Sequence, residues 1–381
     1  MKNIIKLTLF FIMIFAIFLI MPNNSKAATP VTDEESLLSV LWSADPGATV
    51  ELQNNITITK PVVIAKEITI DGNGYTVTGS SDWTSTSGNQ TMFTAQLSDA
   101  KLTLKNIKLQ NGPKYGVQSY DGATVILDNV SITGFKYGAV LVNGGKLEVK
   151  NLHLGYNGTN SNNGIEIDKG AAATNNPTLI MNGTLTTDTN ENVVHAAENG
   201  YLTEFTITNT SNTTNKVVVA GDKVVLTDAA DNVISETKVP EKATVNADTQ
   251  NVVITLIANE QTNKIVVDLG ATITADLLKS HIKLAENYTI DGFFTDAQYT
   301  SEFDFSKTID ADTTIYVRVS EVQTNVPEPN ETPEQNAIPE VNEEKDETPK
   351  TGMQSYLGIA VLVVIISIVG IIFMKKKEIK G

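Results

Sequence analysis

The chain of 381 residues contains no cysteine and a single arginine, Arg318. Without cysteine there are no disulfides, so the stability of the folded chain must come from buried apolar area. Arginine is the side chain that binds a carboxylate through two parallel hydrogen bonds, so such a clamp is hard to build at any site other than Arg318. The formal net charge of −16 argues against nucleic acid and anionic lipid as partners.

The chain does contain a repeat, which lies between residues 101 and 200. Similar octapeptides begin at Leu102, Val125, Leu147 and, in degenerate form, Leu179, which are 23, 22 and 32 residues apart. A second row keeps the same phase and reads Tyr115-Gly-Val, Tyr137-Gly-Ala-Val and Asn163-Gly-Ile-Glu-Ile. Periods of this size indicate a solenoid, because no single repeat can bury its own apolar face.

The position of an asparagine indicates which solenoid is present. Asn106, Asn129 and Asn151 each follow the second apolar position of a repeat by two residues, unlike the asparagine of leucine-rich repeats. Strand alternation would point all three inward at a bend, where stacked coils would align the amides into a structural ladder. The sequence therefore predicts a right-handed parallel β-helix.

Two further features place this β-helix at residues 28–215. The string Ile68-Thr-Ile-Asp-Gly-Asn-Gly-Tyr75, together with the ladder, resembles the pectate-lyase-like β-helix superfamily. Thr32 to Glu35 forms a capping box, which predicts a helix over residues 36–44 that covers the open end of the first coil. Residues 216–250 are β-rich, and we interpret them as either a connector or the last coils.

A second module is expected at residues 251–320. Tyr288-Thr-Ile-Asp-Gly-Phe-Phe-Thr-Asp296 and Ile309 to Tyr316 resemble the Listeria–Bacteroides repeat, the B-repeat of internalin-type surface proteins. The resemblance implies a small β-grasp-like α+β fold with a spacer or interaction role. Phe293-Phe294 stands where that family usually has Trp-Tyr, and both pairs supply aromatic core.

Both ends of the chain carry addressing signals. Residues 1–27 read as a signal peptide that is cleaved after Ala27. At the other end, a Pro/Glu-rich linker at 321–347, expected to be disordered, precedes Thr348-Pro-Lys-Thr-Gly352, an apolar span at 355–374 and a basic tail at 375–381.

The C-terminal arrangement resembles the sortase cell-wall sorting signal of Gram-positive bacteria. It implies cleavage between Thr351 and Gly352 and attachment of Thr351 to peptidoglycan, which makes sortase and peptidoglycan partners. Thr348 stands where the commonest motif has leucine. The expected location is therefore the cell wall, with an uncleaved membrane anchor as the alternative.

The enzymes of this superfamily have catalytic sets that the chain lacks. In pectate lyases the resemblance would imply calcium with an arginine base, and in pectin methylesterases paired aspartates with an arginine clamp. Both sets need an arginine in the β-helix, whereas Arg318 lies in the second module. None of the histidines, which are His153, His195 and His281, belongs to a metal-ligand pattern. Residues 188–192 begin like a calcium loop but lack its glycine and distal glutamate, so we expect no cofactor, with calcium as the alternative. A lysine-based lyase remains open.

Four aromatic residues are candidates for ligand binding. We expect Tyr115 and Tyr137 at equivalent coil positions, and the inserted loops carry Trp83 and Tyr156. Exposed aromatic rings stack on sugars, although a tyrosine beside a glycine also often packs over the backbone. The sequence thus predicts a monomeric, non-catalytic adhesin or glycan-binding β-helix displayed on a stalk, whose ligands are host or environmental glycans. The alternatives are a polysaccharide lyase or hydrolase with an atypical catalytic set and a purely structural spacer.

Overall fold

The computed structural model describes residues 27–158, 163–189 and 191–322. The predicted signal peptide (except residue 27), nearly all of the linker, the sorting motif with Thr351 and Gly352, the apolar span and the basic tail lie outside these ranges. Within them, no helix is long and apolar enough to cross a membrane.

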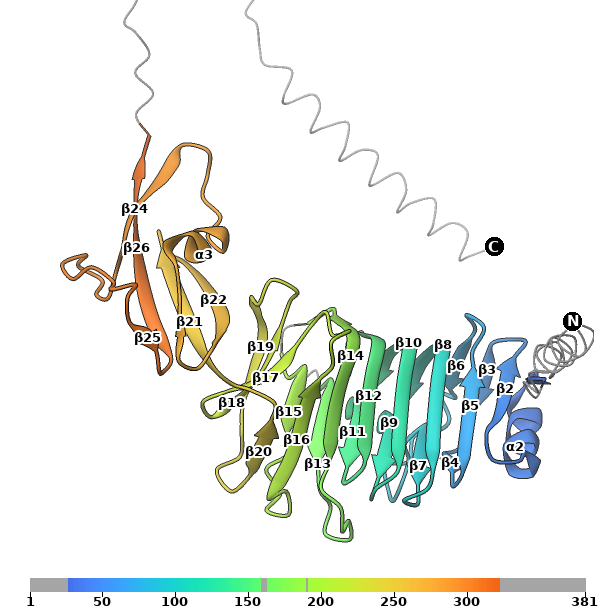
Figure 1. Ribbon diagram of the computed structural model, residues 1–381. Coiled ribbons are helices and arrows are strands. Elements are labelled where there is room, and N and C mark those ends of the chain that lie inside the picture. Colours follow the sequence, from blue (N-terminus) through green and yellow to red (C-terminus); the bar gives the residue numbers. More distant parts are fainter. Residues whose placement is uncertain (1–26, 159–162, 190, 323–381) are drawn as a thin grey trace, which may run out of the picture. The chain divides into compact units, whose positions relative to one another are not determined.

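The protein is mainly β, with stacked parallel sheets consistent with a β-helix (Figure 1). Eleven parallel strands of the described residues form the larger sheet: β1 (Thr29–Val31), β2 (Ala48–Leu52), β3 (Ile56–Ile58), β5 (Glu67–Asp71), β6 (Thr76–Gly79), β8 (Lys101–Gly112), β10 (Thr124–Phe135), β12 (Lys146–Leu154), β14 (Thr178–Thr187), β16 (Glu204–Asn209) and β20 (Thr244–Ala247). Six more form the second sheet: β4 (Val62–Ile64), β7 (Phe93–Gln96), β9 (Tyr115–Tyr120), β11 (Gly138–Asn143), β13 (Ile165–Asp168) and β15 (Val194–Ala196).

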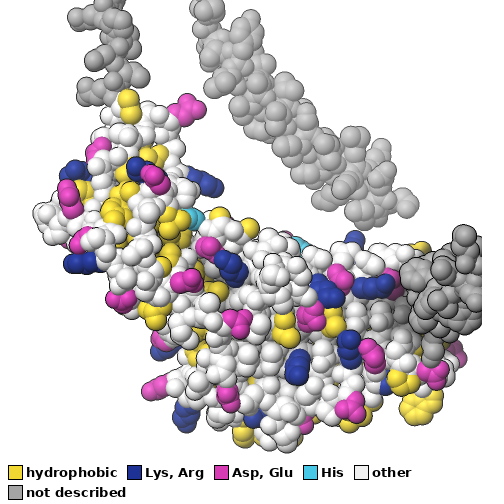
Figure 2. Space-filling view, in the orientation of Figure 1, with side chains coloured by type: hydrophobic (Ala, Val, Ile, Leu, Met, Phe, Trp, Pro, Cys, Tyr) yellow, Lys and Arg dark blue, Asp and Glu magenta, His cyan; other side chains and the backbone are white. Residues whose placement is uncertain are grey.

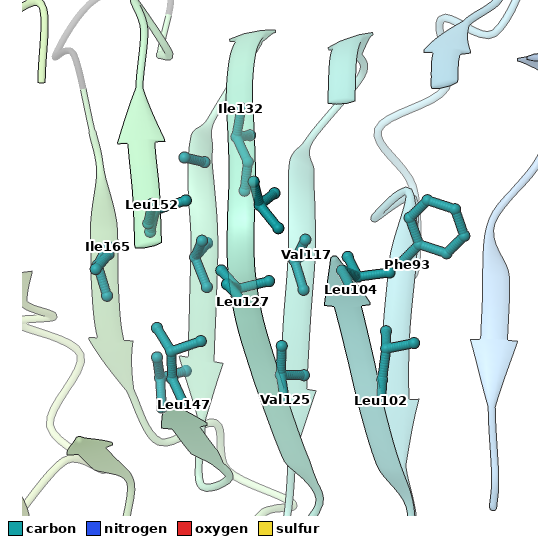
Figure 3. Packing of buried hydrophobic residues seen from close by; sticks show 14 of the residues in the cluster. Phe93, Leu102, Leu104, Val117, Val125, Leu127, Ile132, Leu147, Leu152 and Ile165 are labelled. Atoms are coloured by element: carbon teal, nitrogen blue, oxygen red, sulfur yellow. The ribbon is translucent and has the colours of Figure 1, made fainter. Parts of the chain in front are cut away.

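The strand register follows the sequence repeat. Leu102 pairs with Val125, Val125 with Leu147, and Leu147 with Leu179, so each copy of the octapeptide occupies the same place in successive coils. The apolar side chains of both sheets meet in one core (Figure 3). Burying one such side chain contributes about 1.5–3 kcal/mol, and the rows repeat it coil after coil.

Two of the three predicted ladder asparagines, Asn106 and Asn129, hydrogen-bond to each other, but the predicted inward orientation is wrong. Asn106 and Asn129 adopt left-handed backbone conformations, with φ of 50° and 57°. One left-handed residue breaks the alternation, so the next residue points into the core and the asparagine points outward. Asn129 and Asn151 are exposed and Asn106 is half-buried.

The ladder is also shorter than expected. The Asn129 amide donates to Asn106 Oδ1 at 2.9 Å, and the Asn106 amide donates to Asp71 Oδ1 at 3.2 Å. A register shift between β10 and β12 then places Asn151 opposite Asp128, whose Oδ1 lies 3.4 Å from the Asn151 amide.

A different asparagine is buried between the coils. Asn157, only 3% exposed, donates to the carbonyl oxygens of Ile132 at 3.0 Å and Gly155 at 2.9 Å. Its own Oδ1 accepts the Phe135 N–H at 3.1 Å. All of these partners are main-chain groups, so Asn157 fastens one coil to the next.

Helix α2 (Glu34–Ser43) lies at the N-terminal end of the coils (Figure 1). Its capping box joins Asp33 and Ser36, one residue later than predicted: Ser36 N–H donates to Asp33 Oδ1 at 2.8 Å, and Asp33 N–H donates to Ser36 Oγ at 3.1 Å. Leu37 and Leu41 pack into the core.

The remaining strands form a mixed sheet, in which β21 pairs in parallel with β17 and β26. Its members are β17 (Val217–Ala220), β18 (Lys223–Thr227), β19 (Val233–Lys238), β21 (Gln250–Ala258), β22 (Gln261–Asp268), β24 (Tyr288–Phe294) and β26 (Thr313–Glu321). A short helix, α3 (Ala275–Ser280), and the pair β23 (Ala271–Thr272) and β25 (Thr308–Ile309) accompany it. Residues 216–250 are divided, because β20 extends the larger sheet of the coils while β17, β18 and β19 belong to this mixed sheet.

Candidate functional site

The outer face of the second sheet carries a row of side chains that are polar except for one leucine. Val117, Val140, Ile165 and Val194 occupy one register row and point into the core. Because side chains alternate along a strand, the next row points outward. That outward row contains, on successive strands, Gln118, Leu141, Glu166 and His195.

Tyr115 reaches this row from two strands away. Its phenol donates to Glu166 Oε2 at 2.5 Å, although Tyr115 begins β9 and Glu166 lies on β13. The intervening strand presents Gly138 opposite Tyr115. A Cβ atom at Gly138 would lie 2.9 Å from the tyrosine ring, so the glycine leaves the space in which the ring crosses β11.

His195 approaches the same carboxylate from the other side. Its Nε2 lies 3.8 Å from Glu166 Oε2, and both side chains are more than four-fifths buried. Asp168, two residues along β13 from Glu166, accepts the Lys169 N–H at 2.6 Å and a hydrogen bond from the Asn199 amide.

Burial favours the neutral forms of these groups. Burial raises the pKa of Glu166, although the hydrogen bond from Tyr115 acts in the opposite direction. Burial also raises the pKa of Asp168, and the negative charge of Glu166 raises it further. Burial lowers the pKa of His195 and raises that of the Tyr115 phenol. The pKa of the Glu166 carboxyl and the pKa of the His195 imidazole are therefore shifted toward each other by burial.

An exposed tyrosine, Tyr137, borders Tyr115. The Tyr137 ring stands edge-on to Tyr115 with centroids 6.1 Å apart and remains 39% exposed. Lys114 Nζ lies 5.7 Å from the Tyr137 centroid and donates to the Gly88 carbonyl oxygen at 2.8 Å. We call Tyr115, Tyr137, Glu166, Asp168 and His195 the Tyr115–Glu166 cluster.

The prediction that Tyr115 and Tyr137 occupy equivalent coil positions is wrong. The register places Tyr115 opposite Gly138 rather than opposite Tyr137, because Tyr137-Gly-Ala-Val has one residue more than Tyr115-Gly-Val. Tyr156 is 60% exposed after β12.

The expected exposure of Trp83 is wrong. Trp83 is 8% exposed, belongs to the apolar core and donates its indole N–H to Gln90 Oε1 at 2.6 Å. An inserted loop can bury its one large apolar side chain by folding back on the coils, and this loop does so.

The sequence interpretation missed Glu166 and His195. Glu166 could have been found, because Ile165-Glu166-Ile167-Asp168 alternates and belongs to the second repeat row. His195 follows the long 32-residue step between Leu147 and Leu179, after which the repeat alone no longer predicts register.

The carboxylate that begins the calcium-loop-like stretch at 188–192 faces a histidine of β12. Asp188 lies 3.6 Å from His153 Nε2, and His153 Nδ1 lies 3.1 Å from Thr186 Oγ1. Within the described ranges, no group of three or more histidine, aspartate or glutamate side chains is arranged to hold a metal ion.

A comparison with protein families finds a match to the family described as "Putative pectate lyase-like adhesive domain", over residues 29–159. The match includes Tyr115 and Tyr137 and ends before Glu166 and His195. It indicates an adhesin-like function at an extracellular surface. No curated protein matches the chain.

Proposed function

We propose, from the match to an adhesive-domain family, that the protein is a cell-wall-anchored adhesin whose β-helix binds glycans without turning them over. The observation that carries the proposal is the exposed Tyr137 ring, which stands edge-on to Tyr115, whose phenol donates to the largely buried carboxylate of Glu166. Sugars are commonly bound by an aromatic surface for the ring face together with a few fixed polar groups for the hydroxyls. The parallel sheet holds the aromatic ring and the polar groups in place. These polar groups would accept hydrogen bonds from the hydroxyls of neutral sugars, whereas none of them is an arginine that could clamp a carboxylate.

The other parts of the proposal follow the segments of the sequence. Residues 28–215 would form a right-handed β-helix, and residues 251–320 a β-grasp-like spacer. Three features of the segment support the β-grasp-like fold: β21 pairs in parallel with β26, β21 pairs antiparallel with β22, and the helix α3 follows β22. Residues 321–381 would supply the stalk, the sorting motif and the temporary membrane span.

Binding can be tested with the full chain on an array of neutral glycans. We expect weak binding that falls about tenfold or more in Tyr137→Ala, because the stacking surface is lost. Glu166→Gln should also weaken binding, since the neutral glutamine amide is a weaker hydrogen-bond acceptor than a carboxylate. The matched control is Tyr288→Ala, which removes a tyrosine of similar exposure on β24. Binding that survives Tyr137→Ala and Glu166→Gln equally well would place the glycan elsewhere.

An enzyme of atypical catalytic set is the second candidate. It is favoured by a carboxyl of raised pKa beside a histidine of lowered pKa, an arrangement suited to acid–base chemistry. The same protein, incubated with the glycans that it binds, separates the two candidates. We expect neither unsaturated products nor new reducing ends, whereas turnover that disappears in Glu166→Gln would replace the adhesin proposal with an enzymatic one.

Anchoring is tested in the native host. We expect a muramidase to release the protein while detergent alone does not, because peptidoglycan would hold Thr351 covalently. Thr351→Ala should convert the protein into a detergent-soluble species by blocking cleavage before Gly352. A wild-type protein that detergent extracts fully would contradict sortase linkage.

A further inference from the structure

A groove lies between the N-terminal helix and the first coil, formed by residues that are separate from the Tyr115–Glu166 cluster. It has a volume of about 460 Å³, the size of a small-ligand site. Helix α2 provides one wall, and β4 with its flanking residues provides the other. The principal lining residues are Leu38, Leu41, Trp42, Lys60, Val63 and Lys66.

The apolar surface of this groove faces solvent. Trp42 is 89% exposed, whereas Leu37 and Leu41 of the same helix are buried. Val63, which points outward from β4, is 51% exposed. Both side chains line the same groove, and exposed apolar side chains that gather in one place commonly mark interaction sites.

The charge of the groove is opposite to that of the protein. Two lysines and no acidic residue are among its described lining residues, although the chain has a net charge of −16. On the face of the coils that Figure 2 shows, by contrast, lysines and acidic residues are interspersed.

Two acidic side chains that neighbour the groove along the chain are engaged with residues outside its lining, while Glu35 and Asp45 also lie close to the lining in sequence. Glu34 accepts the Thr59 N–H at 2.8 Å, and Glu67 pairs with Lys101 at 3.3 Å. Lys66 Nζ donates to the carbonyl oxygens of Trp42 and Ala44 at the end of α2, and Lys60 is exposed.

We propose that this groove binds an anionic polysaccharide strand. The Trp42 ring offers a flat surface for the apolar face of a sugar, and the Lys60 ammonium pairs with its carboxylate or sulfate group. A peptide strand would also need partners for its backbone, but the charged groups of this groove are ammonium groups, which only donate. The site therefore suits a chain of sugar rings with charged substituents.

The overall negative charge of the protein does not prevent this binding. At physiological ionic strength charges are screened over about 8 Å, so distant acidic residues contribute little at the groove. The lysines act at contact distance and are less affected. Repulsion should slow the approach of the polymer more than it weakens the bound state.

The test compares dextran sulfate with dextran, which shares its backbone but has no charge, using the full chain in both cases. We expect binding of dextran sulfate only, weakened by added salt. Trp42→Ala and Lys60→Ala should each reduce the affinity about tenfold, by loss of the aromatic surface and of the ion pair. Trp42 is exposed, so an unchanged circular dichroism spectrum should accompany the loss.

The controls are Tyr288→Ala and Lys108→Ala, which change an exposed tyrosine and an exposed lysine outside the groove. Equal binding of dextran, or full binding by Trp42→Ala, would overturn the proposal. So would preferential capture of polyglutamate or anionic vesicles, or a self-association that Trp42→Ala abolishes. None of these results depends on the Tyr115–Glu166 cluster, so the glycan proposal above can fail independently.

Discussion

Asn157→Leu is expected to lower the free energy of unfolding by about 3 kcal/mol, because it leaves buried main-chain groups without partners. The amide of Asn157 bonds to the carbonyl oxygens of Ile132 and Gly155, and its oxygen accepts the Phe135 N–H. Leucine has a similar volume but satisfies none of these groups. Urea unfolding of the full chain, followed by the fluorescence of the buried Trp83, measures the effect.

The matched control is Asn151→Leu, on β12 of the same coil. Asn151 is exposed, and its amide lies 3.4 Å from Asp128 Oδ1, at the limit of a hydrogen bond. We expect a change below about 1 kcal/mol, as for most exposed sites. Equal losses at the two positions would show that Asn157 does not fasten the coils together.

Gly183→Ala is expected to destabilise the coils by about 3 kcal/mol or more, because there is no room for a methyl group. A Cβ at this position would lie 1.8 Å from the Lys150 carbonyl oxygen and 2.7 Å from its carbon. These are main-chain atoms of β12, which cannot move without disturbing the pairing of β12 with β14. The same urea experiment measures this loss.

Gly170→Ala tests whether the effect is specific to that contact. The atoms nearest to its Cβ position belong to the Asn143 side chain, at 3.4 Å, which is ordinary van der Waals contact. Its expected effect is within about 0.5 kcal/mol. If Gly183→Ala is tolerated as well as Gly170→Ala, β14 does not pass β12 as closely as described.

The architecture of the coils could be predicted because it depends on a local rule applied repeatedly. Each strand must bury alternate side chains, so Leu102, Val125 and Leu147 indicate the same place in three coils. The capping helix is similarly local, since Asp33 and Ser36 satisfy its free N–H groups, and the prediction missed the box by one residue. The resemblance to the β-helix superfamily agrees with the family match over residues 29–159.

The outward orientation of the asparagines depended on backbone conformation. Alternation assumes an uninterrupted strand, whereas Asn106 and Asn129 adopt left-handed φ angles at the bend. Asparagine tolerates that conformation better than most residues, which explains its presence there. The residue type was therefore informative, but the direction of its side chain was not.

The sequence by itself determined that this chain stacks parallel coils, because a periodic apolar pattern allows few other ways to bury its surface. The tertiary structure alone decided which side chains meet on the coils. Tyr115 reaches Glu166 only because Gly138 leaves space between them, and His195 joins them through the pairing of β13 with β15. Such contacts depend on register across loops of unequal length, which sequence spacing does not encode. The burial of Trp83 and the exposure of Trp42 likewise depend on how a loop and a helix pack against the coils.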